Sequence, residues 1–370
     1  MEKLERKVYF PNLNGIRFIA AFFVFIHHLE QFKYLYKIEN FWNDNPFIKM
    51  VGKLGVVLFF VLSGFLITYL LLAEEKANNG IEIKNFYIRR ILRIWPLYFL
   101  ILFSGLFIIP ELNFIITPFF NHDIVNEDSF KIILLFIFML PNLAYAIFGL
   151  IPYVSHTWSI GTEEQFYLIW PVLLKFTKNK VRIIVFVIFF YLTFKFLLYT
   201  DFLNLIPFKN LILEFWLSFN IDCMAIGALF SYLLFSKSKL LGFLLNNFLF
   251  YCVLIMVCFL IFSGVNFLFF HYEVYAILFG IIVLNLSSNN SLSRILENNL
   301  FNFLGKISFG IYMYNPFAII LTINFFIYFN YLNNIALLFL SLVITLVLAG
   351  ISFFYFEKFF LLKKNKYSSL

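Results

Sequence analysis

Apolar runs long enough to cross a membrane follow one another along almost the whole length of this chain of 370 residues. Crossing about 30 Å of hydrocarbon takes roughly 20 residues of helix. Such runs start near residues 15, 54, 95, 131, 163, 183, 214, 247, 272, 303 and 335. The longest connections, about 31–52, 74–92 and 110–130, are too short for a separate soluble domain. The sequence therefore predicts an all-α, polytopic membrane helical bundle in which residues 1–370 form one integral-membrane domain.

The composition agrees with this assignment. Hydrophobic residues make up 62% of the chain and charged residues 13%, which is more apolar surface than a water-soluble core absorbs. Residues 1–12 carry charges of both signs and no small-residue cleavage site follows, so we predict a retained first span, not a signal peptide. Cys223, Cys252 and Cys258 have neither metal-ligand nor disulfide spacing, and we interpret them as packing residues. No metal site is predicted.

The net charge of +8 reflects orientation in the bilayer and does not indicate a nucleic-acid partner, because the basic residues cluster at the ends of apolar runs. By the positive-inside rule, the N-terminal tail, 76–93, 175–182, 237–239 and the C-terminal tail lie in the cytoplasm, and the acidic connection 110–130 lies outside. Both termini are therefore expected to be cytoplasmic.

Three apolar stretches lie between residues 93 and 176. Three complete crossings would place the basic segment 175–182 outside, so one stretch is expected not to span the membrane. Residues 131–162 mix Pro, Gly, Asn, Ser and Thr with aromatic residues. Irregular backbone is tolerated at membrane depth only where protein buries it or water reaches it. We predict a re-entrant or broken segment at 131–162 and about ten transmembrane helices. The alternative is a single violation of the positive-inside rule.

The first apolar run carries two ionisable residues on one face. Arg17 and His28 are eleven residues apart, which places them within about 20° of each other after about 16 Å of helix rise. Both should avoid lipid and face the interior. Histidine exchanges protons near neutral pH, so His28 is the best general-base candidate. The alternatives are an Arg17 that reaches the inner headgroups and a His28 that is a hydrogen-bonded core residue; His27 points about 100° away and is expected to be structural.

Three arginines open the third run. Arg89, Arg90 and Arg93 share a broad helix face, and their planar guanidiniums suit bidentate contacts with phosphate. The alternative is that they anchor the helix at the membrane surface. Pro96, just beyond them, is expected to interrupt the hydrogen-bond ladder of the helix, which would widen the mouth of a cavity.

Acidic residues occur at two other apolar positions. Glu163 and Glu164 follow Thr162, a candidate helix cap, and at most one of the two carboxylates is expected to point inward. The alternative is a simple charge pair at a helix N-terminus. Asp222 lies inside an apolar run, where a carboxylate needs a partner and is by default functional.

Five segments, in this order, resemble the membrane acyltransferase 3 family over nearly the whole chain. They are NGIRFIAAFFVFIHH with Arg17 and His28, FFVLSGFLIT around Ser63-Gly64-Phe65, RRILRIWP with Arg90 and Arg93, TWSIGTEEQFYLIWP with Glu163, and LGKISFGIYMYNPF at 304–317. Two positions depart from the pattern. Gly161 replaces a serine, and Asn315 stands where many relatives have histidine, so no proton transfer is assigned to it.

The resemblance implies transfer of an acyl group, most often acetyl, from cytoplasmic acyl-coenzyme A to a hydroxyl of a surface polysaccharide or glycolipid at the bacterial inner membrane. Arg17, Arg90 and Arg93, with Arg89, would hold acetyl-CoA. His28 would act as base, and Glu163 or Asp222 would orient its imidazole.

Direct transfer is favoured, with Ser63, Ser159 and Cys223 as alternative nucleophiles for a covalent intermediate. A different class of function is a transporter or flippase of a lipid-linked sugar or small anion. We see no convincing internal repeat that would favour it.

Overall fold

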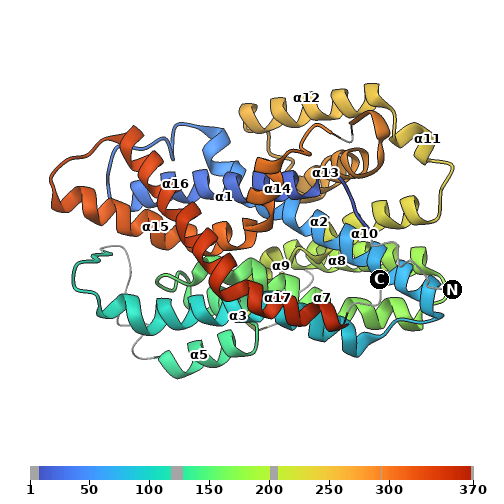
Figure 1. The fold of residues 1–370 in the computed structure, drawn as a ribbon, viewed down its shortest axis with the longest axis horizontal. Coiled ribbons are helices and arrows are strands. Elements are labelled where there is room, and N and C mark those ends of the chain that lie inside the picture. Colours follow the sequence, from blue (N-terminus) through green and yellow to red (C-terminus); the bar gives the residue numbers. More distant parts are fainter. Residues whose placement is uncertain (1–7, 118–127, 201–206, 293, 368–370) are drawn as a thin grey trace.

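The computed structural model describes residues 8–117, 128–200, 207–292 and 294–367, and every regular element in these ranges is a helix (Figure 1). The long elements are α1 (Leu13–Leu35), α2 (Pro46–Asn78), α3 (Ile83–Phe103), α7 (Trp158–Phe176), α8 (Lys180–Tyr199), α9 (Lys209–Phe219), α10 (Ile221–Phe235), α12 (Asn247–Ser263), α13 (His271–Ser288), α15 (Ser308–Tyr328) and α16 (Asn334–Ile351). Shorter ones are α5 (Ser129–Ile137), α6 (Pro141–Phe148), α11 (Leu241–Leu244), α14 (Asn299–Lys306) and α17 (Lys358–Lys364).

Eight helical segments of the described chain are long and apolar enough to cross a membrane. Apolar α12, with 17 residues, and α7, with 19, add two more long elements. Phenylalanines on α8 and α12 face outward with half or more of their side chains exposed, as lipid contact requires: Phe186, Phe189, Phe190, Phe248, Phe259 and Phe262. The expected multi-pass bundle of about ten helices is confirmed.

The region 131–162 is broken, as predicted. The nine-residue α5 and the eight-residue α6 are followed by irregular backbone in which Gly149 and Tyr153 have positive φ angles. Helix α7 then begins at Trp158, earlier than expected. Thr162 therefore lies inside the helix and is not its cap; its Oγ1 instead donates to the Ser218 carbonyl at 3.2 Å.

Helix α3 continues through Pro96 to Phe103. Proline removes one ladder hydrogen bond, but bundle packing tolerates it in membrane helices, and Leu97 and Tyr98 just beyond it are fully buried. The helix ends instead in a π-helical turn at Ser104–Ile108. The basic residues Lys3, Arg6 and Lys7 and most of the acidic connection, residues 118–127, lie outside the described ranges.

The centre of the bundle is formed by α1, α2 and α10, with α12 and α13 along one edge and α5 along the other (Figure 1). Helices α2 and α10 cross in close contact. A Cβ atom at Gly64 would lie 1.8 Å from the Met224 carbonyl oxygen, and one at Gly227 would lie 2.1 Å from that of Val61. Small residues permit such backbone approach in membrane helix pairs.

Only one of the three cysteines is buried as a packing residue would be. Cys223 is buried in α10, whereas Cys252 and Cys258 are exposed on the outward side of α12. All three are free thiols.

Candidate active site

Two cavities lie along α1 and share wall residues. The histidine pocket, of about 160 Å³, is lined by residues that include His27, His28, Lys53, His156 and Trp158. The arginine pocket, of about 80 Å³, is lined by residues that include Arg17, Arg90, Arg93, Glu163 and Tyr167. Val56 and Tyr312 line both cavities. The α1 face predicted to carry Arg17 and His28 therefore borders both cavities. Arg17 lines the arginine pocket and His28 lines the histidine pocket.

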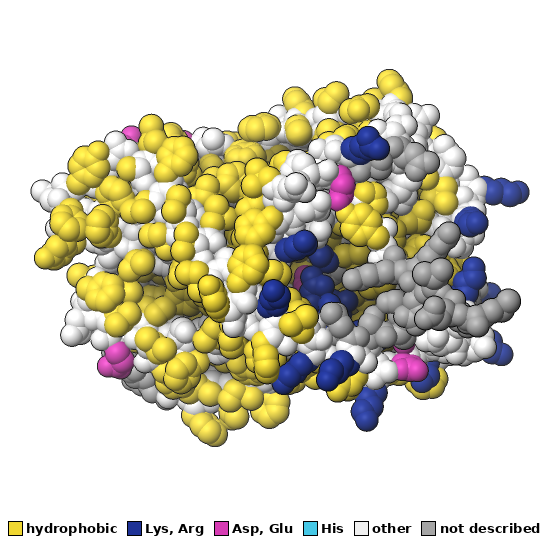
Figure 2. All heavy atoms as spheres, in the orientation of Figure 1, with side chains coloured by type: hydrophobic (Ala, Val, Ile, Leu, Met, Phe, Trp, Pro, Cys, Tyr) yellow, Lys and Arg dark blue, Asp and Glu magenta, His cyan; other side chains and the backbone are white. Residues whose placement is uncertain are grey.

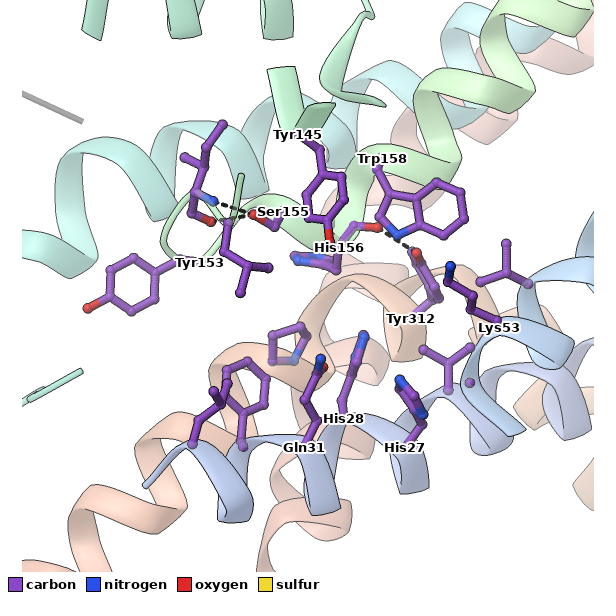
Figure 3. A pocket seen from close by; sticks show the side chains of 18 residues that line it. His27, His28, Gln31, Lys53, Tyr145, Tyr153, Ser155, His156, Trp158 and Tyr312 are labelled. Atoms are coloured by element: carbon purple, nitrogen blue, oxygen red, sulfur yellow. Dashed lines mark hydrogen bonds between the residues drawn. The ribbon is translucent and has the colours of Figure 1, made fainter. Parts of the chain in front are cut away.

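Figure 3 shows how the histidine pocket is built. His27, His28 and Gln31 extend from α1, and Tyr145, Ser155, His156 and Trp158 face them from the broken segment and the start of α7. The irregular backbone predicted at 131–162 thus lines a polar cavity, which is where such backbone is tolerated at membrane depth.

The His28 imidazole is oriented by Asn315 of α15. Its Nδ1 lies 2.6 Å from Asn315 Oδ1. The Asn315 amide nitrogen donates to the Tyr312 carbonyl at 2.7 Å and to the Ile311 carbonyl at 3.1 Å, which fixes Oδ1 toward the ring. Because Oδ1 only accepts, Nδ1 must carry the proton and Nε2 keeps a free lone pair. His28 is therefore held in the tautomer that a general base at Nε2 requires.

Pro316 explains why Asn315 is held so firmly. A proline has no backbone N–H, so the Tyr312 carbonyl, four residues earlier in α15, loses its helix donor. The Asn315 side chain replaces that donor. The sequence step Asn315-Pro316 thus repairs the helix and orients His28 with the same amide group.

His27 is structural, as expected from its direction. Its Nδ1 lies 2.8 Å from the Ile48 carbonyl oxygen of α2. Gly52 makes room for the ring, since a Cβ there would lie 2.2 Å from an imidazole carbon. The ring still forms part of the pocket wall.

His156 is a third histidine of this pocket that sequence reasoning did not single out. It is 7% exposed, its ring centroid lies 6.5 Å from that of His28, and its Nε2 has no hydrogen-bond partner within the described chain. The only signal was its position beside Trp158 in the broken segment. Its backbone carbonyl accepts the Tyr312 hydroxyl at 2.5 Å, which connects this segment to α15.

The arginine pocket gathers three cations around one carboxylate. Glu163 accepts hydrogen bonds from Ser63 Oγ at 3.1 Å and from the Tyr167 hydroxyl at 2.7 Å. Within the described ranges, Arg17, Arg90 and Arg93 form no ion pair shorter than 4.0 Å. Partly buried guanidiniums without paired carboxylates favour an anionic ligand with several oxygens.

The surroundings of this pocket support an anion site. Arg90 lies over the Tyr167 ring at 5.2 Å and over the Phe86 ring at 5.6 Å, so aromatic faces hold the guanidinium in place without neutralising it. Figure 2 shows Lys and Arg side chains gathered around a hollow near the middle of one face of the molecule.

Arg89 does not join this pocket. Its guanidinium pairs with Glu74 at 2.9 Å and donates to the Tyr367 carbonyl at 2.7 Å. Neighbouring residues on a helix point about 100° apart, so Arg90 faces the cavity and Arg89 faces away. The expected division between the two glutamates is found as well: Glu163 faces the arginines and Glu164 accepts from Trp95 Nε1 at 2.9 Å.

Asp222 and Glu163 do not contact the imidazole that they were expected to orient. Asp222 is fully buried in the first turn of α10, beside the ion pair that Lys195 and Glu273 form at 2.7 Å. It lines neither pocket. Its span is broken at Asn220, which separates α9 from α10 and sets Asp222 toward α8 and α13. Asn315 takes the orienting position instead.

A family model described as an acyltransferase domain matches residues 10–354. The chain belongs to this acyltransferase family. The match confirms the resemblance drawn from the five segments. Among the described residues, no group of three His, Cys, Asp or Glu side chains is placed to hold a metal ion.

Curated relatives of this acyltransferase cover part of its length. The peptidoglycan O-acetyltransferase OatA of Listeria monocytogenes is 34% identical over 183 residues, which are 46% of this chain and 26% of that protein. A Bacillus subtilis protein named "Putative peptidoglycan O-acetyltransferase YrhL" is 32% identical over 174 residues, 46% of this chain and 25% of its own length. The matched region thus spans about a quarter of these relatives. No solved structure matches the chain.

Proposed function

We propose that this membrane protein transfers an acetyl group from acetyl-coenzyme A to a hydroxyl of a cell-envelope glycan or glycolipid. The observation that carries the proposal is the pair of adjoining pockets, one with three guanidiniums that form no ion pair among the described residues and the other with an imidazole whose Nε2 has no hydrogen-bond partner there. Membership of an acyltransferase family and relatives named as peptidoglycan O-acetyltransferases support it.

On the donor side, Arg17, Arg90 and Arg93 bind the phosphates of the coenzyme. The pantetheine arm then runs along α1 past Val56 and Tyr312, over the roughly 16 Å of helix rise between Arg17 and His28. The Glu163 carboxylate reduces the repulsion between the three guanidiniums. Hydrogen bonds from Ser63 and Tyr167 hold this carboxylate in place. The surrounding apolar helices limit the access of water to the thioester.

On the acceptor side, the hydroxyl donates to His28 Nε2 and its oxygen attacks the thioester carbonyl carbon. The carbon–sulfur bond breaks, and the thiolate takes up the proton from the imidazolium, so that the histidine is regenerated. Asn315 Oδ1 stabilises the imidazolium through Nδ1. Direct transfer is supported because Ser63 bonds to Glu163 and Ser159 to Tyr312, and neither bonds to a histidine in the described chain. Cys223 lines neither pocket.

The basic segments support an orientation with both termini in the cytoplasm of a bacterial inner membrane. Because α5 and α6 are too short to span, α3 crosses from the cytoplasmic side to the outer side and α7 crosses back. This places the basic residues 175–182 in the cytoplasm. The arginine pocket then opens toward cytoplasmic coenzyme, and the histidine pocket lies in the outer half.

An acetyl-transfer assay tests the function. We expect purified full-length protein in nanodiscs to release coenzyme A from radiolabelled acetyl-coenzyme A and to place the label on added peptidoglycan glycan strands. A flippase would instead leave the thioester intact while moving a fluorescent lipid-linked sugar across the bilayer. That second outcome would contradict the proposal.

Asn315→Leu is expected to lower acetyl transfer about 5- to 13-fold per folded molecule, since it removes the hydrogen bond that fixes the His28 tautomer, worth about 1–1.5 kcal/mol. Asn324→Leu is the matched control. Asn324 is also buried on α15 and donates to the carbonyl four residues earlier, but it lines neither pocket. Equal losses of activity in the two variants would mean that Asn315 serves only the stability of α15.

A further inference from the structure

The histidine pocket contains a lysine and no carboxylate. Its ionisable wall residues are three histidines, three tyrosines and Lys53, and neither aspartate nor glutamate belongs to its wall. Lys53 is exposed and has no carboxylate within 4.0 Å in the part of the chain that the structure describes. Its ammonium lies 5.7 Å from the centroid of the Tyr272 ring. The pocket wall therefore includes a cation that no carboxylate of the described residues neutralises.

Lys53 stands at the boundary of the apolar part of α2. Helix α2 begins at Pro46, and Lys53 lies about 10 Å along it, directly before the apolar run that starts near residue 54. A lysine at such a boundary can reach water, so its place in the pocket wall, and not its depth, is the reason to assign it a ligand. Figure 3 shows Lys53 entering the pocket from α2 and His28 entering it from α1. A ligand bound at His28 thus occupies the same cavity as the ammonium group.

We propose that the acceptor sugar carries an anionic group close to the hydroxyl that is acylated, and that Lys53 is the counter-ion that selects it. This inference rests on the proposed function and names the substrate class of its acceptor. A carboxylate of a sugar acid and a phosphate of a lipid-linked sugar both supply the anionic oxygens that an ammonium group binds strongly. Tyr145 and Trp158 are among the aromatic residues of the wall, while the lysine sets the charge.

The test compares acceptors that differ in charge. One pair is the methyl glycoside of N-acetylmuramic acid and its methyl ester. The second pair is N-acetylglucosamine 1-phosphate and methyl N-acetylglucosaminide. Full-length protein in nanodiscs, with acetyl-coenzyme A as donor, should acylate the charged member of at least one pair with the higher kcat/KM. The pair that shows the preference distinguishes a carboxylate from a phosphate.

Lys53→Gln should lower kcat/KM for the charged acceptor about 10-fold or more, mainly through KM, because a charge-assisted hydrogen bond is lost. The loss with the neutral acceptor should be several-fold smaller, and Lys53→Arg should retain most of the preference. Lys49→Gln is the matched control, since Lys49 lies one turn earlier on α2, is also exposed and does not line the pocket.

Three results would overturn the inference: no preference for charge in the unmodified protein, equal losses on both members of a pair in Lys53→Gln, or the same loss of preference in Lys49→Gln. The first comparison needs no variant, so the inference stays decidable if Lys53→Gln does not fold. Failure of the proposed function looks different, because acetyl-coenzyme A would then stay intact with all four acceptors.

Discussion

His28→Ala is expected to reduce acetyl transfer by about 10²- to 10⁴-fold while leaving the binding of coenzyme A nearly unchanged, which is the range that a positioned general base contributes. The reason is geometric. The Nδ1 proton is committed to Asn315, so Nε2 is the ring atom available to take the proton of the attacking hydroxyl. The arginine pocket, which is the proposed donor site, does not include His28.

Two measurements separate chemistry from binding. Single-turnover transfer from radiolabelled acetyl-coenzyme A measures the chemical step, and isothermal titration with coenzyme A measures donor affinity. His271→Ala is a suitable control because His271 is a histidine of α13 outside both pockets. Full transfer by His28→Ala would show that another group deprotonates the acceptor, and His156, whose ring lies 6.5 Å from that of His28 and whose Nε2 has no hydrogen-bond partner in the described chain, would be the next to test.

Periodicity along one helix gave the most accurate part of the predicted site. The eleven-residue spacing of Arg17 and His28 placed both on one face of α1, and each lines one of two adjoining pockets. The irregular composition of 131–162 likewise predicted a broken segment, because unsatisfied backbone cannot face lipid. Both inferences depend only on local geometry and on the bilayer as solvent.

Contacts between distant helices could not be predicted in this way. Asn315 orients His28 across 287 residues of chain, and nothing local shows that α15 packs against α1. The same limit explains Asp222: its depth in an apolar run was informative, but the break at Asn220 directs it toward Lys195 and Glu273. In the described chain Lys195 pairs with Glu273, and neither Asp222 oxygen has a hydrogen-bond partner, an arrangement that no local sequence pattern indicates.

The double variant Arg90→Ala, Arg93→Ala is expected to weaken coenzyme A binding by about 10²- to 10⁴-fold, since each charge-assisted hydrogen bond contributes about 1.5–3 kcal/mol and about 1.4 kcal/mol corresponds to tenfold in affinity. Isothermal titration of the nanodisc-embedded protein measures the effect. Both guanidiniums line the arginine pocket and lack an ion-pair partner in the described residues, so the coenzyme phosphates lose their main contacts.

Arg89→Ala provides the control for this double variant, because it removes the same side chain from the same helix at a position that pairs with Glu74 outside the pocket. Its effect should fall on stability, with donor affinity retained. If all three arginines served only to anchor α3 at the membrane surface, the variants would alter membrane insertion. Arg89→Ala and the double variant would then have the same affinity for coenzyme A as the unmodified protein. A loss of coenzyme A affinity in the Arg90→Ala, Arg93→Ala variant but not in Arg89→Ala would require an anion bound inside the bundle. Glu163→Gln, which removes the one carboxylate that lines the arginine pocket, should then leave the affinity for coenzyme A equal or higher.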